Sequence, residues 1–183
     1  MAINARGAAT EYWLELALQT GGLSISDIDL QTVPFGDVAA ALDNGSIDAS
    51  MLGEPLTTLG EDQDLVQVLT EDFVDGQQPT AVFWNREWAE NNPEVAEGFL
   101  DAYLRAVERL ENGGWEDPAV LALLEEYTNV PADVIARSSR PFNSVEGELD
   151  LEGFRNQETF FREQGLLTYD GELDFETFMR TGE

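Results

Sequence analysis

Residues 4–55 read NARGAATEYWLELALQTGGLSISDIDLQTVPFGDVAAALDNGSIDASMLGEP, and the hydrophobic pattern changes in kind several times along them. Apolar residues recur at helical spacing over about 8–20, and two glycines follow that run. Short apolar runs at 28–33 and 47–52 have the length of strands. Because helical and strand-like runs alternate, this segment predicts a parallel α/β sheet.

The amino-acid composition of the chain shifts near Gln78, and the predicted structure changes there from mixed strands and helices to mostly helices. We expect further strands at 2–4, 65–69 and 80–84, and helices at 38–42, 86–91, 92–111, 118–127, 131–137, 151–164 and 174–180. The sequence therefore predicts an α/β part at residues 1–79 and a mostly helical part at 80–183.

Length and hydropathy place the chain among folded proteins. Its 183 residues suffice for one ordinary domain or two small lobes, and 43% hydrophobic residues support a core. No apolar run approaches the roughly 20 residues of a membrane-spanning helix, so we expect no membrane span. The opening residues, MAINARGAAT, show no basic end followed by an apolar run, so no signal peptide is visible.

Three residue types are absent: cysteine, histidine and lysine, and all nine basic residues are arginine. Without lysine there is no Schiff base to pyridoxal phosphate and no phosphate-loop lysine. Without histidine or cysteine there is no imidazole base, thiolate nucleophile or typical zinc site. We therefore predict no catalytic residue, no cofactor and no metal site.

The formal net charge is −28, from 37 acidic and nine basic residues. Nucleic acid would be repelled, because its binding needs a basic face. An acidic excess with no lysine is a pattern that we associate with halophilic or marine organisms with GC-rich genomes. We expect most of these carboxylates to form a solvated surface, and metal ligation by some of them is the alternative.

Four blocks in order carry a resemblance to a known family. They are NARGAATEYWLELAL, VPFGDVAAALDNGSIDASMLGEP, NPEVAEGFLDAYLRAVERL and LDLEGFRNQETFFREQGLL, and together they cover nearly the whole chain. The chain resembles the solute-binding proteins of ABC importers in the nitrate, sulfonate, taurine and thiamine-pyrimidine group, called SsuA/THI5-like or NMT1-like. The second block alone is weak evidence, because similar runs occur in many binding proteins.

The resemblance implies a periplasmic-binding-protein-like fold of type II, in which two lobes close on a solute. Residues 1–79 would form lobe two, and 80–183 would supply a return strand and the helices of an incomplete lobe one. The first part of lobe one has no counterpart here, so we expect an N-terminal truncation. The full-length relative would be periplasmic or lipid-anchored and would deliver its solute to ABC permease subunits.

Candidate ligand-binding residues follow from where loops leave the sheet. Ligands of open α/β sheets bind beyond the carboxyl ends of the strands. The loop with Arg6, Gly7, Ala8 and Thr10 would offer an arginine, free helix amides and a hydroxyl to an anionic or carbonyl group. The alternative is an ordinary helix start with Arg6 in solvent.

Three further candidates lie after other strands. The Glu54 carboxylate could accept hydrogen bonds from an amine or aminopyrimidine, or it could simply suit the start of a helix. Phe35 could wall the cleft, while the neighbouring Asp37 is expected to cap a helix. Trp84 could stack on a planar ligand, and core packing is the alternative.

These residues leave two ligand classes open. Arg6 favours an organic anion such as a sulfonate, nitrate or carboxylate, whereas Glu54 and the aromatic residues favour a nitrogen heterocycle. The leading function is capture of such a solute in a cleft between the lobes, without catalysis. The alternatives are a ligand-sensing domain of a regulator and, less favoured, a THI5-like pyrimidine-synthesis enzyme, whose histidine this chain lacks.

Overall fold

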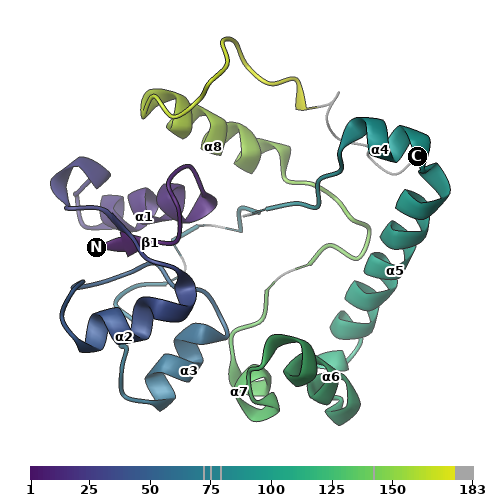
Figure 1. The fold of residues 1–183 in the computed structure, drawn as a ribbon, viewed down its shortest axis with the longest axis horizontal. Coiled ribbons are helices and arrows are strands. Elements are labelled where there is room, and N and C mark those ends of the chain that lie inside the picture. The colour runs from purple at the N-terminus through teal and green to yellow at the C-terminus, as the bar shows by residue number, and fades with distance from the viewer. Residues whose placement is uncertain (72, 75, 79, 142, 176–183) are drawn as a thin grey trace. The chain divides into compact units, whose positions relative to one another are not determined.

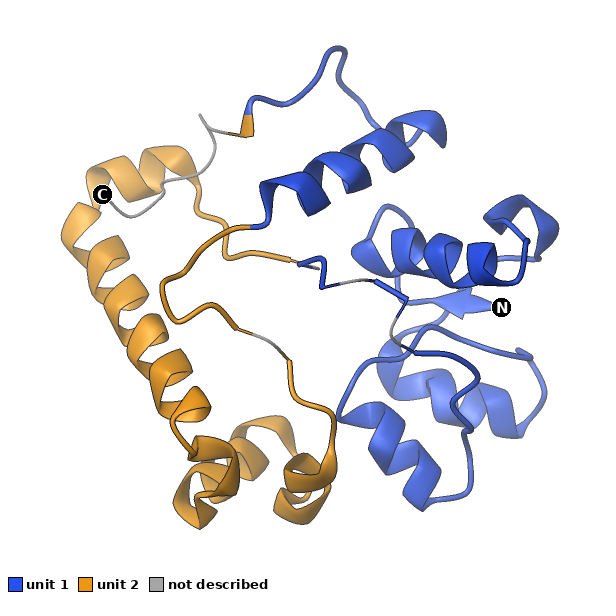
Figure 2. Ribbon diagram, turned by 180° about the vertical axis from the view of Figure 1, so that it is seen from behind, with its two compact units in different colours: residues 1–79, 150–174 blue, residues 80–149, 175–183 orange. Residues whose placement is uncertain are grey.

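The computed structural model describes residues 1–71, 73–74, 76–78, 80–141 and 143–175. The chain divides into two compact units, coloured separately in Figure 2. Unit 1 comprises residues 1–79 and 150–174, and unit 2 comprises residues 80–149 with Phe175. The predicted assignment of residues 1–79 and 80–183 to lobes of a clamp stays a prediction.

A small parallel sheet forms the centre of unit 1. Strand β1 (Ala2–Ile3) pairs in parallel with β2 (Gln31–Thr32), and Ala2 also forms a parallel bridge to Ser50. The Ala2 N–H donates to the carbonyl of Ala49 and the Met51 N–H donates to the carbonyl of Ala2, both at 2.9 Å. The predicted parallel α/β sheet is therefore present, although its strands are shorter than the apolar runs at 28–33 and 47–52.

Both faces of this sheet are covered (Figure 1). Successive strand residues point to opposite faces, so Ala2 and Ile3 belong to different clusters although both are 0% exposed. Ile3 packs with Leu14 and Leu18 of helix α1 (Ala9–Thr20). Ala2 packs with Val38 and Ala41 of helix α2 (Val38–Asp43) and with Ile47. A buried sheet with a helix on each face is the layered arrangement typical of parallel α/β folds.

Unit 1 also has short elements besides these. They are the 3₁₀ turns η1 (Ile25–Asp27) and η2 (Phe35–Asp37), and helix α3 (Leu56–Asp62). The predicted cap by Asp37 is wrong in one respect, because its side chain makes no capping hydrogen bond to α2. The predicted strand at 65–69 is also absent, and no described segment pairs with those residues.

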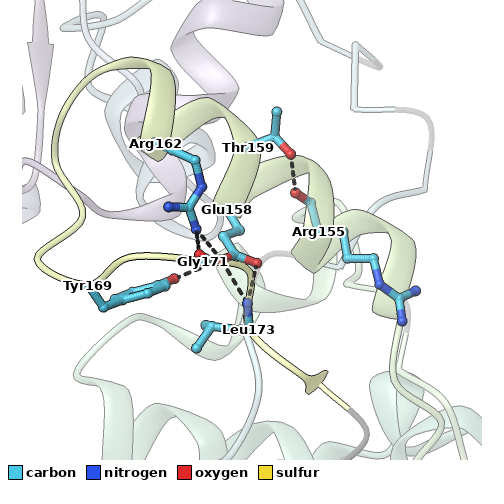
Figure 3. A network of polar contacts seen from close by, with 7 residues as sticks. All are labelled: Arg155, Glu158, Thr159, Arg162, Tyr169, Gly171 and Leu173. Atoms are coloured by element: carbon cyan, nitrogen blue, oxygen red, sulfur yellow. Dashed lines mark hydrogen bonds and ion pairs between the residues drawn. The ribbon is translucent and has the colours of Figure 1, made fainter.

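Helix α8 (Leu151–Glu163) completes unit 1 by packing on α1, where the rings of Tyr12 and Phe160 lie 5.5 Å apart. A polar network on its far end, shown in Figure 3, centres on Glu158, which is 8% exposed. Its carboxylate accepts hydrogen bonds from Arg162, from the Tyr169 hydroxyl at 3.1 Å and from the Leu173 amide at 3.0 Å. The segment after α8 is thereby fixed back onto the helix.

A second polar network joins residues 77 and 78 to α8. The Gln78 N–H donates to Asp150 Oδ2 at 3.1 Å, and the Asp150 N–H donates in return to Gln78 Oε1 at 3.0 Å. The Tyr12 hydroxyl donates to Gln77 Oε1 at 3.0 Å. The chain leaves unit 1 after residue 79 and returns at Asp150, so these reciprocal bonds hold its exit beside its re-entry.

Unit 2 is helical in its described part. Its elements are α4 (Arg86–Asn91), α5 (Pro93–Glu111), the 3₁₀ turn η3 (Gly114–Glu116), α6 (Pro118–Thr128) and α7 (Ala132–Arg137), close to the predicted helices. The predicted strand at 80–84 is absent, because no described segment offers those residues a hydrogen-bonding edge. The predicted helix at 174–180 lies mostly outside the described residues.

The apolar stripe of α5 is largely exposed. Val95 is 59%, Phe99 48% and Tyr103 40% exposed, whereas Ala96 and Val107 on the same helix are buried. Helix α5 packs against α4 and η3 within unit 2. In the described part of the chain no helix is both long and apolar enough to cross a membrane.

Candidate functional site

Three loops leave the sheet of unit 1 at the same edge. Because β1, β2 and the segment at Ser50 run parallel, their carboxyl ends face the same way. The loop with Gly7 follows β1, the turn with Phe35 follows β2, and Glu54 follows the segment at Ser50. This edge is where ligands of open α/β sheets are found, so the predicted residues of unit 1 follow the strands as expected.

The loop after β1 is held by a buried carboxylate. Gly7 has φ = +71°, a left-handed conformation that glycine adopts without steric cost. Its N–H donates to Glu11 Oε2 at 2.6 Å, and Arg6 Nη2 lies 3.0 Å from Glu11 Oε1. The Glu11 side chain is 0% exposed, while that of Arg6 is 49% exposed. Arg6 and Gly7, both predicted to face a ligand, are thus already paired within the chain.

The start of α1 uses part of its polar capacity internally. The Thr10 hydroxyl donates to Asn4 Oδ1 at 2.5 Å, which links the first turn of the helix to the loop. Ala8 is the N-cap residue with extended backbone angles and has no side chain that could cap the helix. The first amides of α1 are the groups of this loop that a helix leaves without an internal acceptor.

Glu54 and Phe35 occupy different settings at the same edge. Glu54 is exposed, and its Oε2 accepts hydrogen bonds from the Thr58 N–H at 3.1 Å and the Thr58 hydroxyl at 2.8 Å. These bonds stabilise the first turn of α3 and leave the other carboxylate oxygen at the surface. Phe35 is half-buried at the start of η2.

Trp84 belongs to unit 2, where it is 39% exposed. Its ring stacks on Trp88 at a centroid distance of 5.4 Å and meets Phe99 edge-on at 5.1 Å. Phe99 in turn stacks on Tyr103 at 6.5 Å. These four side chains form an aromatic row that links α4 to α5.

Two surface hollows lie elsewhere. One of about 710 Å³ in unit 2 follows α5 from Gly98 to Asn112, and one of about 290 Å³ in unit 1 lies at the start of α8 beside Gln77 and Asp150. No residue predicted to bind ligand lines either hollow. The acidic side chains of the described residues form no cluster that could hold a metal ion.

Sequence reasoning missed the burial of Glu11 and the distant partners of Tyr12, both of which lie beside the candidate site. Glu11 shares a helix face with Leu14 and Leu18, at i, i+3 and i+7, and this spacing indicates its burial. Tyr12 is 7% exposed, and burial together with the charge of Asp150 raises its pKa, although the hydrogen bond to Gln77 opposes the shift. The partners of Tyr12 lie 65 or more residues away along the sequence, so no local sequence pattern predicts these contacts.

The fold defines an α/β protein with loops gathered at the carboxyl edge of a parallel sheet. The sequence model of the NMT1-like family matches residues 1–123, and the chain belongs to this family. A search of curated proteins found no match to the chain. The family consists mostly of solute-binding proteins of the SsuA/THI5 type.

Proposed function

We propose that this chain is the solute-binding component of an ABC importer and takes its solute at the carboxyl edge of the unit 1 sheet. The observation that carries the proposal is the match to the NMT1-like family over the residues that form this edge. The loops with Gly7, Phe35 and Glu54 supply backbone amides, a half-buried ring and a carboxylate. Such a mixture of apolar wall and few polar groups suits a small solute.

The solute is a small organic anion or a nitrogen heterocycle. The amides at the start of α1 support an anion such as a sulfonate or nitrate, although the guanidinium of Arg6 is paired with Glu11. The exposed carboxylate of Glu54 and the ring of Phe35 support a heterocycle with N–H donors, of the thiamine-pyrimidine kind. Trp84 in unit 2 stays a predicted stacking residue for either class.

The proposed role is non-catalytic and extracytoplasmic. Solute-binding proteins act by adopting a closed state that the bound solute favours, in proportion to its extra affinity for that state. The closed form would then be recognised by permease subunits in the membrane. The absence of histidine, cysteine and lysine supports binding over chemistry, because the side chains most used as bases and nucleophiles are missing.

The experiment is a thermal-shift screen of the whole chain with sulfonates, nitrate, taurine, carboxylates and aminopyrimidines. A solute of the right class should raise Tm with a dependence on its concentration, since it binds the folded form. The same solute should have a weaker effect on Glu54→Gln or on Thr10→Ala. Glu116→Gln, an exposed change in unit 2, is the matched control and should respond as the wild type does. A screen in which no solute raises Tm would contradict the proposed function.

A further inference from the structure

The Glu11 carboxylate occupies a place that a bound anion would otherwise take. It is 0% exposed, at the amino end of a 12-residue helix, where the helix dipole favours negative charge. It accepts a hydrogen bond from the Gly7 N–H at 2.6 Å and lies 3.0 Å from the Arg6 guanidinium. These are a backbone donor and a cation of the kind that hold sulfonate or phosphate groups in binding sites.

The pairing around Glu11 is incomplete in one respect. Its Oε1 is buried and accepts no hydrogen bond in the described part of the chain, and the Arg6 guanidinium lies 3.0 Å away as its ion-pair partner. The positive charge of Arg6 is therefore the main compensation for that oxygen. A buried charge that loses its partner is strongly unfavourable, so Arg6 is not free to turn toward a ligand.

A competing anion would meet unfavourable charges along the rest of this edge as well. Glu54 is an exposed carboxylate, and Asp37 is exposed and makes no capping bond. The Asn4 side-chain oxygen already accepts the Thr10 hydroxyl. Carbonyl and carboxylate oxygens thus outnumber free cationic donors at the edge, which favours a ligand that donates hydrogen bonds.

We propose that Glu11 determines specificity by filling the anion position with the chain's own carboxylate. Resting on the proposed function, this assigns the solute to neutral or cationic compounds with N–H donors and excludes sulfonates, nitrate and carboxylates. Glu11 acts through Arg6 and Gly7 and is a positioning residue. The exposed carboxylate oxygen of Glu54 is the acceptor that the solute's N–H groups reach.

The test is an amide NMR titration of the whole chain, which detects weak binding residue by residue. Methanesulfonate is the anionic probe, compared with sodium chloride at equal ionic strength. The amides of Gly7, Ala8 and Thr10 should respond equally to both salts in the wild type. In Glu11→Gln the amide oxygen can still accept from Gly7, but Arg6 is released, so methanesulfonate should bind saturably and at least about tenfold more tightly than to the wild type.

Two results would overturn the assignment of Glu11. One is saturable methanesulfonate binding by the wild type with an affinity equal to that of Glu11→Gln. The other is no response to methanesulfonate in the folded Glu11→Gln variant. Arg6→Gln tests the same point without altering the buried carboxylate. Its response to methanesulfonate should match that of the wild type. If the wild type responded to methanesulfonate and Arg6→Gln did not, the assignment would also be overturned.

The solute class has its own probe, 4-aminopyrimidine at a slightly alkaline pH where the ring is neutral. The amides of Glu54 and Thr58 should shift in the wild type and stay in place in Glu54→Gln, and no shift in the wild type would overturn the class. The thermal-shift screen separates this proposal from the function beneath it. A screen that yields an anionic solute retains solute capture and overturns the role of Glu11, whereas a screen without any solute overturns solute capture itself.

Discussion

Helices α1 and α5 both carry a regular apolar stripe, but only the stripe of α1 is buried. Leu14 and Leu18 of α1 are 1% and 8% exposed, whereas Val95 and Phe99 of α5 are 59% and 48% exposed. Helix α1 lies on a parallel sheet, and α5 belongs to a unit that has no strand among its described residues. Periodicity predicts a helix and its apolar face, whereas burial depends on which other element covers that face.

This comparison predicts very different costs for similar truncations. Leu14→Ala should lower the free energy of unfolding by about 2–5 kcal/mol, because it opens a cavity between α1 and the sheet. Phe99→Ala should cost less than about 1 kcal/mol, because this residue is already 48% exposed. Urea unfolding followed by circular dichroism measures both. Equal losses for the two variants would show that α5 is covered in solution.

The polar contacts differ in the same way as the apolar ones, because the acidic residue compared in unit 1 is buried and the one in unit 2 is exposed. Glu158 of unit 1 is 8% exposed and accepts hydrogen bonds from Arg162, Tyr169 and Leu173, so Glu158→Ala removes a buried acceptor and three hydrogen bonds. We expect a loss of about 1–3 kcal/mol. Glu116 of unit 2 is 61% exposed in its ion pair with Arg140, and Glu116→Ala should change stability by less than about 1 kcal/mol. A larger effect at Glu116 than at Glu158 would contradict this ranking.

Tyr12 allows the buried contacts of α1 to be tested by pH. Burial, with a further contribution from Asp150, raises its pKa above the ordinary value of about 10. A raised pKa means that folding favours the neutral phenol, so this stabilisation is complete below about pH 10 and is lost as the pH rises through the folded-state pKa. The free energy of unfolding should fall more steeply there in the wild type than in Tyr12→Phe. Parallel curves for the two proteins would contradict the burial of the hydroxyl.

Much of the architecture could be predicted because it is local. The helices at 9–20, 93–111, 118–128 and 151–163 follow from apolar periodicity and from glycine or asparagine near their ends, and those at 93–111 and 118–128 also follow from proline at their starts. The strands were the weaker predictions. The run at 80–84 has the composition of a strand, but a strand also needs an edge to pair with, and that edge is not encoded in the run itself.

The candidate site could be located more readily than it could be interpreted. Gly7 and Glu54 follow the carboxyl ends of parallel segments, which their places in the sequence indicate. The pairing of Arg6 with Glu11 changes how this loop is interpreted: the sequence suggests a free cation for a ligand, whereas the structure has an arginine whose charge is compensated by Glu11. Which of several acids an arginine selects depends on the turn geometry at Gly7, and residue type alone does not determine it.

Substitutions in the aromatic row of unit 2 should have the smallest effect of those considered, and they report most directly on whether α5 is exposed. Trp84 and Trp88 are 39% and 40% exposed, whereas the indole nitrogens of Trp13 and Trp115 are buried. Acrylamide, an uncharged quencher that the acidic surface does not repel, should quench wild-type fluorescence more efficiently than that of the Trp84→Phe, Trp88→Phe double variant. Trp13→Phe should raise the average quenching efficiency above that of the wild type. In urea the quenching efficiencies of all variants should become equal. If the double variant were instead quenched as strongly as the wild type, Trp84 and Trp88 would be shielded in solution, and the contrast between α1 and α5 would then reflect a covering partner rather than an open helix face.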